Sequence, residues 1–445
     1  MNNMNELNIN IIDKFEENYE SDLSNKVIES AIFKNGLKQS SLNNEVVKKH
    51  NFVFSHETKV GNITNQKQSG RCWIFAGLNS IRIKLMQTFN TDSIELSQNY
   101  LHFFDKLEKA NFYLNWVENH GLELENEDRL FRHFNASPIS DGGYWEFFVN
   151  LVKKYGIVTK EAMNESFSSE STGDMVTQIN WRLKAYTAKM RKEFAISKDK
   201  KQISLLKEKA LEDVYNILVK SLGKPPKKFK FEFMDKDKKY VSLDEMSPTD
   251  FYNKYLSEFV ESKVDLVSDP RNKFEHNSII QAPLCNNMVG GNPLTMINVD
   301  IEVMKDVMIK QIKSGEAVWF GCDVSTFSNK DGILDSNLFN FDLTLTKTPD
   351  FSKAEKFESR ASVIAHAMNM VGVNLDKNNK AINWKVENSW GSDIGHKGFW
   401  SMSDQWFTDY NYMAIVDKKF LPKEVLEAFN KPISTITPFD PLCDE

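Results

Sequence analysis

The hydrophobic residues in the first part of the chain recur with the period of an α-helix. Apolar positions fall on one helix face and charged residues on the other. Four segments show this pattern: residues 5–33, 72–85, 178–194 and 205–222. Pro225-Pro226 ends the last of them, because proline interrupts helical hydrogen bonding. Alternating phenylalanines then predict a charged hairpin over residues 229–243.

The pattern changes after about residue 264, where the apolar runs become short and strand-like. Five segments predict strands in this half: residues 317–324, 363–373, 382–390, 397–402 and 412–416. Residues 52–65 also alternate like a strand. A mainly helical half is therefore expected to precede a β-rich half.

Composition limits the class of protein. The 445 residues are 41% hydrophobic and 27% charged, which excludes a disordered chain and allows two or three domains. The net charge of -6 gives no overall reason to expect a nucleic-acid or membrane partner. The lysine-rich residues 184–239 contain interspersed acidic residues, which favours solvated helix faces over a nucleic-acid site.

Targeting and cysteine patterns suggest a location. The N-terminal residues lack the basic start and apolar run of a secretory signal. No stretch approaches the roughly 18 to 20 apolar residues of a membrane span. The four cysteines are scattered, without zinc or redox spacing. We therefore expect a cytoplasmic protein with reduced thiols, no metal and no cofactor.

Cys72 stands at the start of a predicted helix. There, the unpaired main-chain N–H groups and the helix dipole favour a thiolate. Most isolated cysteines are small core residues, but a turn at Ser69-Gly70 can fold Gln66 back beside this thiol. The Gln66 amide and the Cys72 N–H would then stabilise an oxyanion. The segment therefore predicts a nucleophile.

A thiolate nucleophile needs a base, and His366 is the candidate because it lies in an apolar strand. A lone histidine there is more often a satisfied core residue. However, Asn388 shares strand parity with Ile382, Trp384 and Val386, so its amide oxygen can accept from His366. Trp390 would keep water from that bond. The other seven histidines favour solvated or capping roles: His50, His56, His102, His120, His133, His276 and His396.

Cys72, His366 and Asn388 together predict a Cys/His/Asn triad, and the chain resembles the papain-like cysteine peptidases. Within them it is similar to the bleomycin hydrolase and bacterial aminopeptidase C family. Gly70-Arg71-Cys72-Trp73 resembles the papain signature, yet His366 follows Cys72 by 294 residues, about twice the usual interval. Further similar stretches are residues 96–100, 105–111, 141–145, 154–156, 247–252, 287–291, 318–321 and 387–391.

The resemblance implies an α+β, two-lobed papain-like fold with an inserted helical domain and an N-terminal helical extension. The catalytic helical lobe would carry the cysteine, and the β-rich lobe the histidine and asparagine. The expected divisions are the N-terminal extension at 1–55, the helical lobe at 56–165, the insertion at 166–262, the β-rich lobe at 263–420 and a C-terminal arm reaching the active site at 421–445.

The resemblance also implies roles for single residues. Cys72 would be the nucleophile, His366 the base and acid, Asn388 the group that orients His366, and Gln66 the oxyanion donor. Gly142 and Gly143 resemble the glycine segment that pairs with an extended substrate, although a plain turn is the alternative reading. Trp390 would shield the bond between Asn388 and His366.

The C-terminal arm bears on substrate choice. In relatives it enters the cleft and its carboxylate meets the substrate's amino group, which makes an aminopeptidase. Here only four residues follow Pro441, about two fewer than usual, which at about 3.3 Å per residue leaves the carboxylate about 6 to 7 Å short. Longer chains could then enter, or Asp444 and Glu445 could supply the charge instead. A frayed tail is the alternative.

We therefore expect a cytoplasmic cysteine aminopeptidase that hydrolyses peptides through a thioester. The alternatives are an endopeptidase of the same family, admitted by the short arm, and a non-catalytic assembly or nucleic-acid-binding protein. The resemblance further implies a homohexamer whose active sites face an inner chamber. Some relatives bind nucleic acid, so that role stays open.

Overall fold

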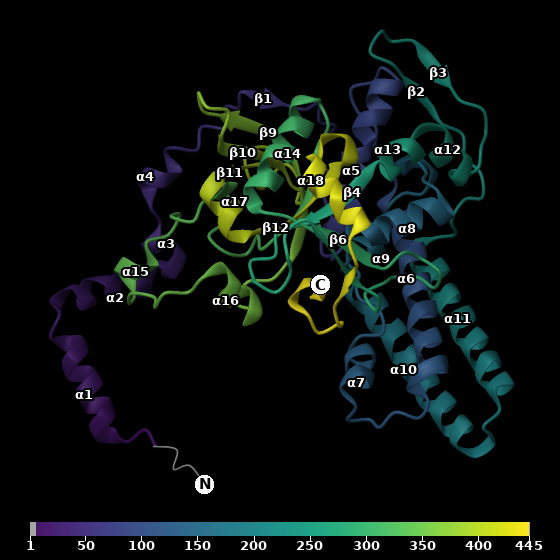
Figure 1. Cartoon of the computed structure of the whole chain (residues 1–445), viewed down its shortest axis with the longest axis horizontal. Coiled ribbons are helices and arrows are strands. Elements are labelled where there is room, and N and C mark those ends of the chain that lie inside the picture. Colours follow the sequence, from purple (N-terminus) through teal and green to yellow (C-terminus); the bar gives the residue numbers. More distant parts are fainter. Residues whose placement is uncertain (1–5, 445) are drawn as a thin grey trace.

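A helix-rich lobe and a lobe built around a large mixed sheet lie side by side, and a slender helical arm projects at the N-terminal end (Figure 1). The structure is a computed structural model that describes residues 6–444. It confirms the expected α+β class, with the helices concentrated early in the chain.

The sheet has the order β13-β5-β6-β4-β12-β7-β9-β10-β11-β8, and β1 pairs with β9 outside this path. Its strands are β1 (His56–Glu57), β4 (Lys263–Val267), β5 (Ser278–Ala282), β6 (Leu294–Asn298), β7 (Val318–Cys322), β8 (Ile333–Leu334), β9 (His366–Leu375), β10 (Ala381–Glu387), β11 (Phe399–Ser403), β12 (Asn411–Asp417) and β13 (Ser434–Thr435). Alternation along β7 sends Val318 and Phe320 into one core and Trp319 into the other. Both faces of the sheet are therefore covered.

Helix α5 (Cys72–Thr88) packs on one face, against β9 and β7. It is buried along most of its length, and the Trp319 indole N–H donates to the Trp73 carbonyl at 3.3 Å. On the other face lie α14 (Ile301–Lys313) and α17 (Asp404–Tyr410). The first residue of α5 thus meets the sheet where β9 begins.

The helical lobe continues with α6 (Gln98–Trp116) and α8 (Trp145–Tyr155). A long antiparallel pair, α10 (Gly173–Ser197) and α11 (Lys200–Leu222), extends from it (Figure 1). The predicted hairpin is β2 (Glu232–Met234) with β3 (Tyr240–Ser242). Smaller helices are α7 (Arg129–Ala136), α9 (Phe167–Glu170), α12 (Pro248–Tyr255), α13 (Ser257–Glu261), α15 (Phe341–Thr344) and α16 (Lys353–Glu358).

The N-terminal arm consists of α1 (Ile9–Glu20), α2 (Leu23–Asn35), α3 (Leu37–Ser41) and α4 (Asn44–Val47). No side chain of α1 or α2 is buried. The arm meets the body through α3 and α4, where Leu42 bridges to Phe339. The outer helices contact each other, and α2 also contacts α3, but neither contact buries a side chain of α1 or α2.

The C-terminal segment is fixed to the body. After α18 (Lys423–Leu426), β13 pairs in parallel with β5. The buried Asp440 carboxylate then accepts from Arg271 (2.9 Å) and Lys273 (2.7 Å). Leu442 and Cys443, which follow, are also buried. The arm is thus docked and is not a frayed tail.

Several local predictions were wrong. Residues 52–65 form only the short strand β1, and α14 and α17 are helices within the half predicted as strands. The register of β10 shifts between Ala381 and Asn383, so Ile382 is 52% exposed and does not share the face of Trp384 and Val386. An irregularity in pairing breaks simple alternation.

Two histidines were also misassigned to solvated or capping roles. His102 lies on α6 and is fully buried, with neither ring nitrogen hydrogen-bonded among the described residues. Burial, together with the nearby Lys106, holds the pKa of His102 well below its usual range. His50 bonds to Ser401 (2.8 Å) and Asp335 (3.3 Å).

Candidate active site

A cavity of about 330 Å³ lies where the two lobes meet. The helical lobe contributes Gln66, Cys72 and the segment Ser140 to Tyr144, and the β-rich lobe contributes Ile364 to Ala367 with His366 among them. The structure therefore brings together residues that are distant in sequence.

Cys72 is partly buried at the first position of α5. Burial raises the pKa of its thiol to about 11, against the lowering effect of the main-chain N–H groups of Ala367, Trp73 and Cys72 itself. The helix start acts in the predicted direction, but desolvation is larger. Burial of the thiol thus opposes the thiolate that its position at the helix start favours.

His366 and Asn388 are joined by a hydrogen bond of 2.9 Å between Nε2 and Oδ1. The Ser389 main-chain N–H also donates to that Oδ1, at 2.7 Å, so the oxygen is an acceptor in both contacts. In neutral His366 the proton consequently lies on Nε2, and Nδ1 has the free lone pair. The geometry prepares Nδ1 to accept a proton.

Trp390 covers the imidazole, with ring centroids 4.8 Å apart. His366 is 7% exposed and Asn388 1% exposed. Burial lowers the pKa of His366 to about 4, partly opposed by the Asn388 hydrogen bond. Trp390 thus lies against the pair as a shield would.

The Gln66 amide is held in one orientation. Its Oε1 accepts from the Ser389 hydroxyl at 2.7 Å, and its Nε2 donates to the Ser69 carbonyl at 2.6 Å. These contacts use one of the two N–H bonds of the amide. Since Gln66 lines the cavity beside Cys72, the other N–H can serve an oxyanion.

Gly142 and Gly143 both line the cavity. A Cβ on Gly143 would lie 2.6 Å from the Trp73 ring, so packing alone requires glycine at this position. Lys109 donates to the Gly142 carbonyl. Trp73 and Lys109 therefore fix the position of this segment, and the segment also borders the cavity.

Asp141 is a functional candidate that sequence reasoning passed over, although it precedes these glycines. Its carboxylate accepts from the Gly70 N–H (3.2 Å) and the Thr172 hydroxyl, and it forms an ion pair with Lys106 (3.0 Å). Its carbonyl accepts from the Trp73 indole at 2.8 Å. Asp141 thus connects the glycine segment to both flanks of Cys72.

The end of the C-terminal arm lies beside the cavity. The Asp444 carbonyl accepts from the hydroxyl of Tyr144, a cavity residue, at 3.1 Å. The Asp444 carboxylate instead pairs with Arg360 at 2.7 Å. Glu445, the other predicted anion, lies outside the described residues.

Residues 6–444 contain no group of three or more histidine, cysteine, aspartate or glutamate side chains arranged to hold a metal ion. In the same residues, no helix has the length and apolar character needed to cross a membrane.

Known proteins resemble this chain over nearly its whole length. Aminopeptidase C of Listeria monocytogenes is 38% identical over 441 residues, 98% of each chain, and bleomycin hydrolase of Mus musculus is 37% identical over 387 residues, 85% of each. The crystal structure of PepW from Lactobacillus rhamnosis superposes with a TM-score of 0.95 at 34% identity, covering 99% of both chains. The profile of the Peptidase C1-like family matches residues 6–443. The chain therefore belongs to the Peptidase C1-like family, as the residues around Cys72, His366 and Asn388 predict.

Proposed function

We propose that the protein is a cysteine aminopeptidase that removes N-terminal residues from peptides through a thioester on Cys72. Cys72 is the nucleophile and His366 the base and acid. Asn388 orients the imidazole, and Gln66 stabilises the oxyanion. The support is that Gln66, Cys72 and His366 line one cavity and that the hydrogen bond from His366 to Asn388 leaves Nδ1 as the acceptor.

The chemistry proceeds in two halves. His366 Nδ1 takes the thiol proton as sulfur attacks the peptide carbonyl, and the oxyanion receives N–H bonds from Cys72 and Gln66. The C–N bond then breaks, and His366 returns the proton to the leaving amine. His366 then takes a proton from water as the water oxygen attacks the thioester carbonyl. The C–S bond breaks, the N-terminal residue leaves as an acid, and His366 returns the proton to the Cys72 sulfur.

The observation that favours removal of N-terminal residues is the position of the arm. Its end meets Tyr144 beside the glycine segment, on the side where the acyl part of an extended substrate would lie. A docked chain there limits how far a substrate can extend beyond its first residues. The name of the Listeria relative, aminopeptidase C, agrees with this arrangement.

A direct test compares hydrolysis of one peptide with a free and with an acetylated N-terminus. We expect the free amine to be preferred by about 10- to 150-fold in kcat/KM, the range of a charge-assisted contact worth about 1.5 to 3 kcal/mol. Removing only residues 444–445 should reduce this preference, because it removes the anionic end of the arm. The rest of the arm should stay docked, since Leu442 and Cys443 are buried. Equal cleavage of both peptides by the intact enzyme would contradict the proposal.

A second test concerns the catalytic residues. A thiol-directed epoxide should label Cys72 and spare Cys285 and Cys322, which are buried. Cys72→Ala should abolish hydrolysis with the fold intact. His366→Ala should be more damaging than Asn388→Ala in single-turnover acylation, since only the former removes the proton acceptor. Preferential labelling of another cysteine would overturn the assignment.

An endopeptidase remains the second candidate, and one contact favours it. Because the Asp444 carboxylate pairs with Arg360, its charge is partly neutralised and is less able to hold a substrate amine. Efficient cleavage of acetylated peptides at internal bonds would favour this activity.

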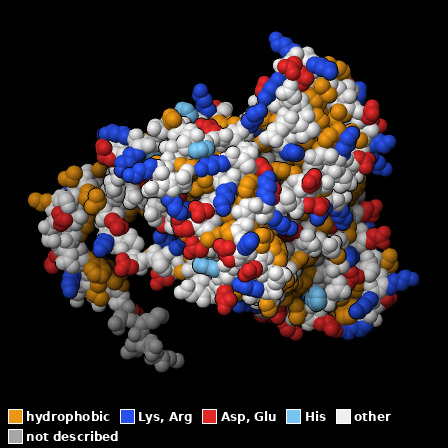
Figure 2. All heavy atoms as spheres, turned by 45° about the horizontal axis from the view of Figure 1, so that its top comes forward, with side chains coloured by type: hydrophobic (Ala, Val, Ile, Leu, Met, Phe, Trp, Pro, Cys, Tyr) orange, Lys and Arg blue, Asp and Glu red, His pale blue; other side chains and the backbone are white. Residues whose placement is uncertain are grey.

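We also propose that the enzyme self-assembles and works in the cytoplasm. Exposed apolar side chains gather on the projecting arm (Figure 2), where a second copy of the chain would cover them. A hexamer is the assembly that the resemblance implies. The cysteines form no disulfide within residues 6–444, which fits a reducing compartment.

A further inference from the structure

A second cavity, of about 530 Å³, borders the candidate active site across Trp390. Trp390 packs against His366 and also lines this cavity. The cavity walls come from two distant parts of the chain. Lys38 and Leu42 belong to the N-terminal arm, whereas Lys330, Phe339, Trp390 and Trp400 belong to the β-rich lobe.

The chemistry of the proposed function fixes which part of a substrate approaches this cavity. His366 must return its proton to the leaving amine, so the leaving peptide begins at the imidazole. The acyl part lies toward Gly142 and Gly143, in the cavity that contains Cys72. A leaving peptide that continues away from Cys72 passes Trp390 and reaches the second cavity.

The inner wall is aromatic and has an unused donor. Trp390 and Trp400 meet edge to face with centroids 5.4 Å apart. Trp400 is 2% exposed, and its indole N–H has no acceptor among residues 6–444. Buried donors are rarely left unpaired. The Trp400 N–H is itself covered, so this wall offers a peptide the apolar surface of the two rings, which suits apolar side chains.

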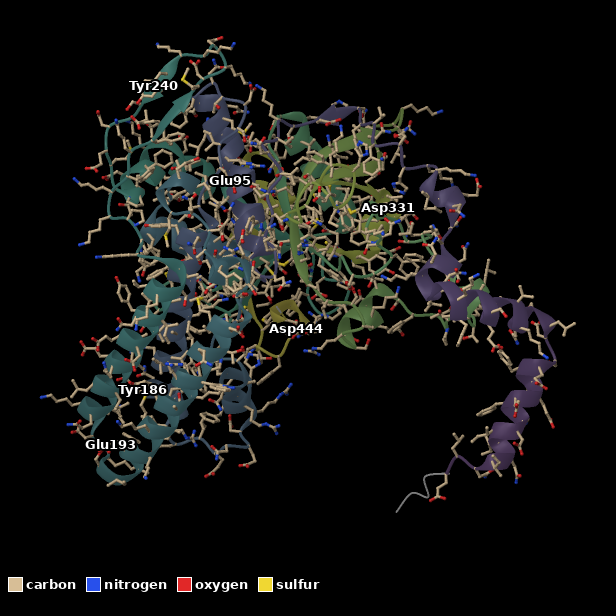
Figure 3. The ribbon with its side chains drawn as sticks, turned by 180° about the vertical axis from the view of Figure 1, so that it is seen from behind. Glu95, Tyr186, Glu193, Tyr240, Asp331 and Asp444 are labelled. Carbon is tan, nitrogen blue, oxygen red and sulfur yellow. The ribbon has the colours of Figure 1, made fainter. Side chains whose placement is uncertain are left out.

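The rim carries an excess of positive charge. Lys38 and Lys330 line the cavity together with a single anion, Asp331, which Figure 3 shows on the side of the body that faces the arm. In the described part of the chain neither lysine forms an ion pair. Both are exposed. Lys38 Nζ lies 5.7 Å from the centroid of the Phe339 ring, which also lines the cavity. Two ammonium groups without an anionic partner among the described residues, at the end of an aromatic cavity, favour a carboxylate.

Both lysines are carried by backbone that is fastened in place. The Asn43 N–H donates to the Leu338 carbonyl (2.8 Å) and the Asn340 N–H to the Ser41 carbonyl (2.7 Å), which ties down the segment just after Lys38. The Lys330 carbonyl accepts from the Gly395 N–H at 2.9 Å. Main-chain hydrogen bonds therefore hold the cavity-lining part of the arm against the β-rich lobe.

We propose that this cavity binds the leaving part of the substrate and that Lys38 and Lys330 receive its terminal carboxylate. The enzyme then prefers short peptides with a free C-terminus. This inference rests on the proposed function, because it takes the direction of the substrate from the role of His366.

The test uses matched short peptides that differ only in a C-terminal carboxylate or carboxamide. We expect the acid to be preferred by about 3- to 10-fold in kcat/KM, mainly through KM, since each exposed charge contributes modestly. The ratio should fall toward one in the Lys38→Gln/Lys330→Gln double variant. It should persist in Lys34→Gln, a control on the same arm outside the cavity. Raised salt should weaken the preference.

Binding separates this inference from the proposed function. Calorimetry with the Cys72→Ala variant and the same two peptides should show the preference for the acid without turnover, and the two lysine changes should abolish it. Equal affinity for acid and amide would overturn the inference even if hydrolysis occurs. Absence of hydrolysis by the unmodified enzyme, with the binding preference present, would overturn the proposed function instead.

Discussion

Burial keeps Cys72 and His366 uncharged when each is considered alone, because the pKa of the thiol is about 11 and that of the imidazole about 4. In the proposed mechanism, transfer of the proton from sulfur to Nδ1 creates two opposite charges in one cavity, and each compensates the desolvation of the other. The reactive species that we propose is a pair that shares one proton.

This pair sets a pH dependence. As pH falls through about 4, His366 takes a proton from solvent and can no longer accept one from Cys72. We expect the rate of Cys72 alkylation by iodoacetamide, an uncharged reagent, to fall on the acid side near pH 4 and to stay high through neutrality. An acid limb above pH 6 would contradict the burial of His366 described above.

Substitutions of Asn388 should move this limb in opposite directions. The Asn388 hydrogen bond raises the pKa of His366, so Asn388→Leu, of similar volume, should shift the limb to lower pH. Asn388→Asp adds a negative charge beside the imidazole and should shift it to higher pH. The same alkylation measurement checks both, and shifts of the same sign would show that the contact does not control the imidazole.

Asp265, in β4, is a buried carboxyl group without a donor. It is 5% exposed, and both oxygens lack hydrogen bonds within residues 6–444. Burial, and then the nearby Glu146, raise the pKa of Asp265 well above its usual 3.8. As pH rises above 3.8 the unfolded chain loses this proton while the folded chain keeps it, so the group increasingly destabilises the fold.

Asp265→Asn removes this titration at nearly constant volume. We expect its free energy of unfolding, relative to the unmodified protein, to increase between pH 4 and pH 8 by on the order of 1 to 3 kcal/mol. Denaturant titrations at both pH values measure it, with Asp13→Asn on the exposed α1 as the control. A difference that does not change with pH would show that Asp265 is ionised in the fold.

At this scale the sequence predicted which side chains meet but not their electrostatics. Gln66 and Cys72 could be related because one turn joins them, and Asn388 because it follows an apolar strand. The direction of the Cys72 pKa could not be predicted, since it depends on how the two lobes exclude water. The burial of His102 is likewise a result of packing around α6.

Asp141 connects two structural elements of the site. Its carboxylate joins the segment before α8 to Gly70, just ahead of α5, and Lys106 of α6 neutralises it. We expect Asp141→Asn to lower kcat/KM by about 10-fold or more, as for the loss of a charged hydrogen bond. The negative charge of Asp141 also raises the pKa of Cys72. Its removal alone would favour the thiolate, so a fall in activity would indicate lost positioning.

Asp105→Asn is the matched control for this prediction. Asp105 also pairs with Lys106, at 3.0 Å, and is fully buried, but it makes no described contact with Gly70. We expect the control to lose thermal stability while retaining most of its kcat/KM. Equal losses of activity in both variants would reduce Asp141 to a purely structural residue.

Strongly periodic elements were predictable, whereas elements that depend on distant partners were not. Helices α10 and α11 match their apolar periods because one face is buried along the helix, whereas α5 is buried on nearly all sides. The register shift in β10 depends on its pairing with β9 and has no local signature. Helix α14 was not predicted, although its buried residues Met304, Val307, Met308 and Ile312 recur at helical spacing.

In our proposal, the projecting arm controls whether the protein self-assembles. Val27 is 71% exposed and Phe33 92% exposed on α2, an unfavourable state unless another chain covers them. We expect the double change Val27→Glu/Phe33→Ser to shift the protein to a smaller species in analytical ultracentrifugation. Glu29→Gln on the same helix is the control. An unchanged mass would show that assembly does not use this face.

Strand β12 is central in the sheet but is one of the last strands to be synthesised. β12 lies between β4 and β7 and joins the part of the sheet that contains β5 and β6 to the part that contains β9 and β10. The ribosome makes it after all of these strands, so the sheet cannot close until translation has passed residue 417. His366 and Asn388 are themselves made late, long after Cys72. A growing chain would thus carry Cys72 for most of its synthesis without the two residues that the proposed mechanism pairs with it.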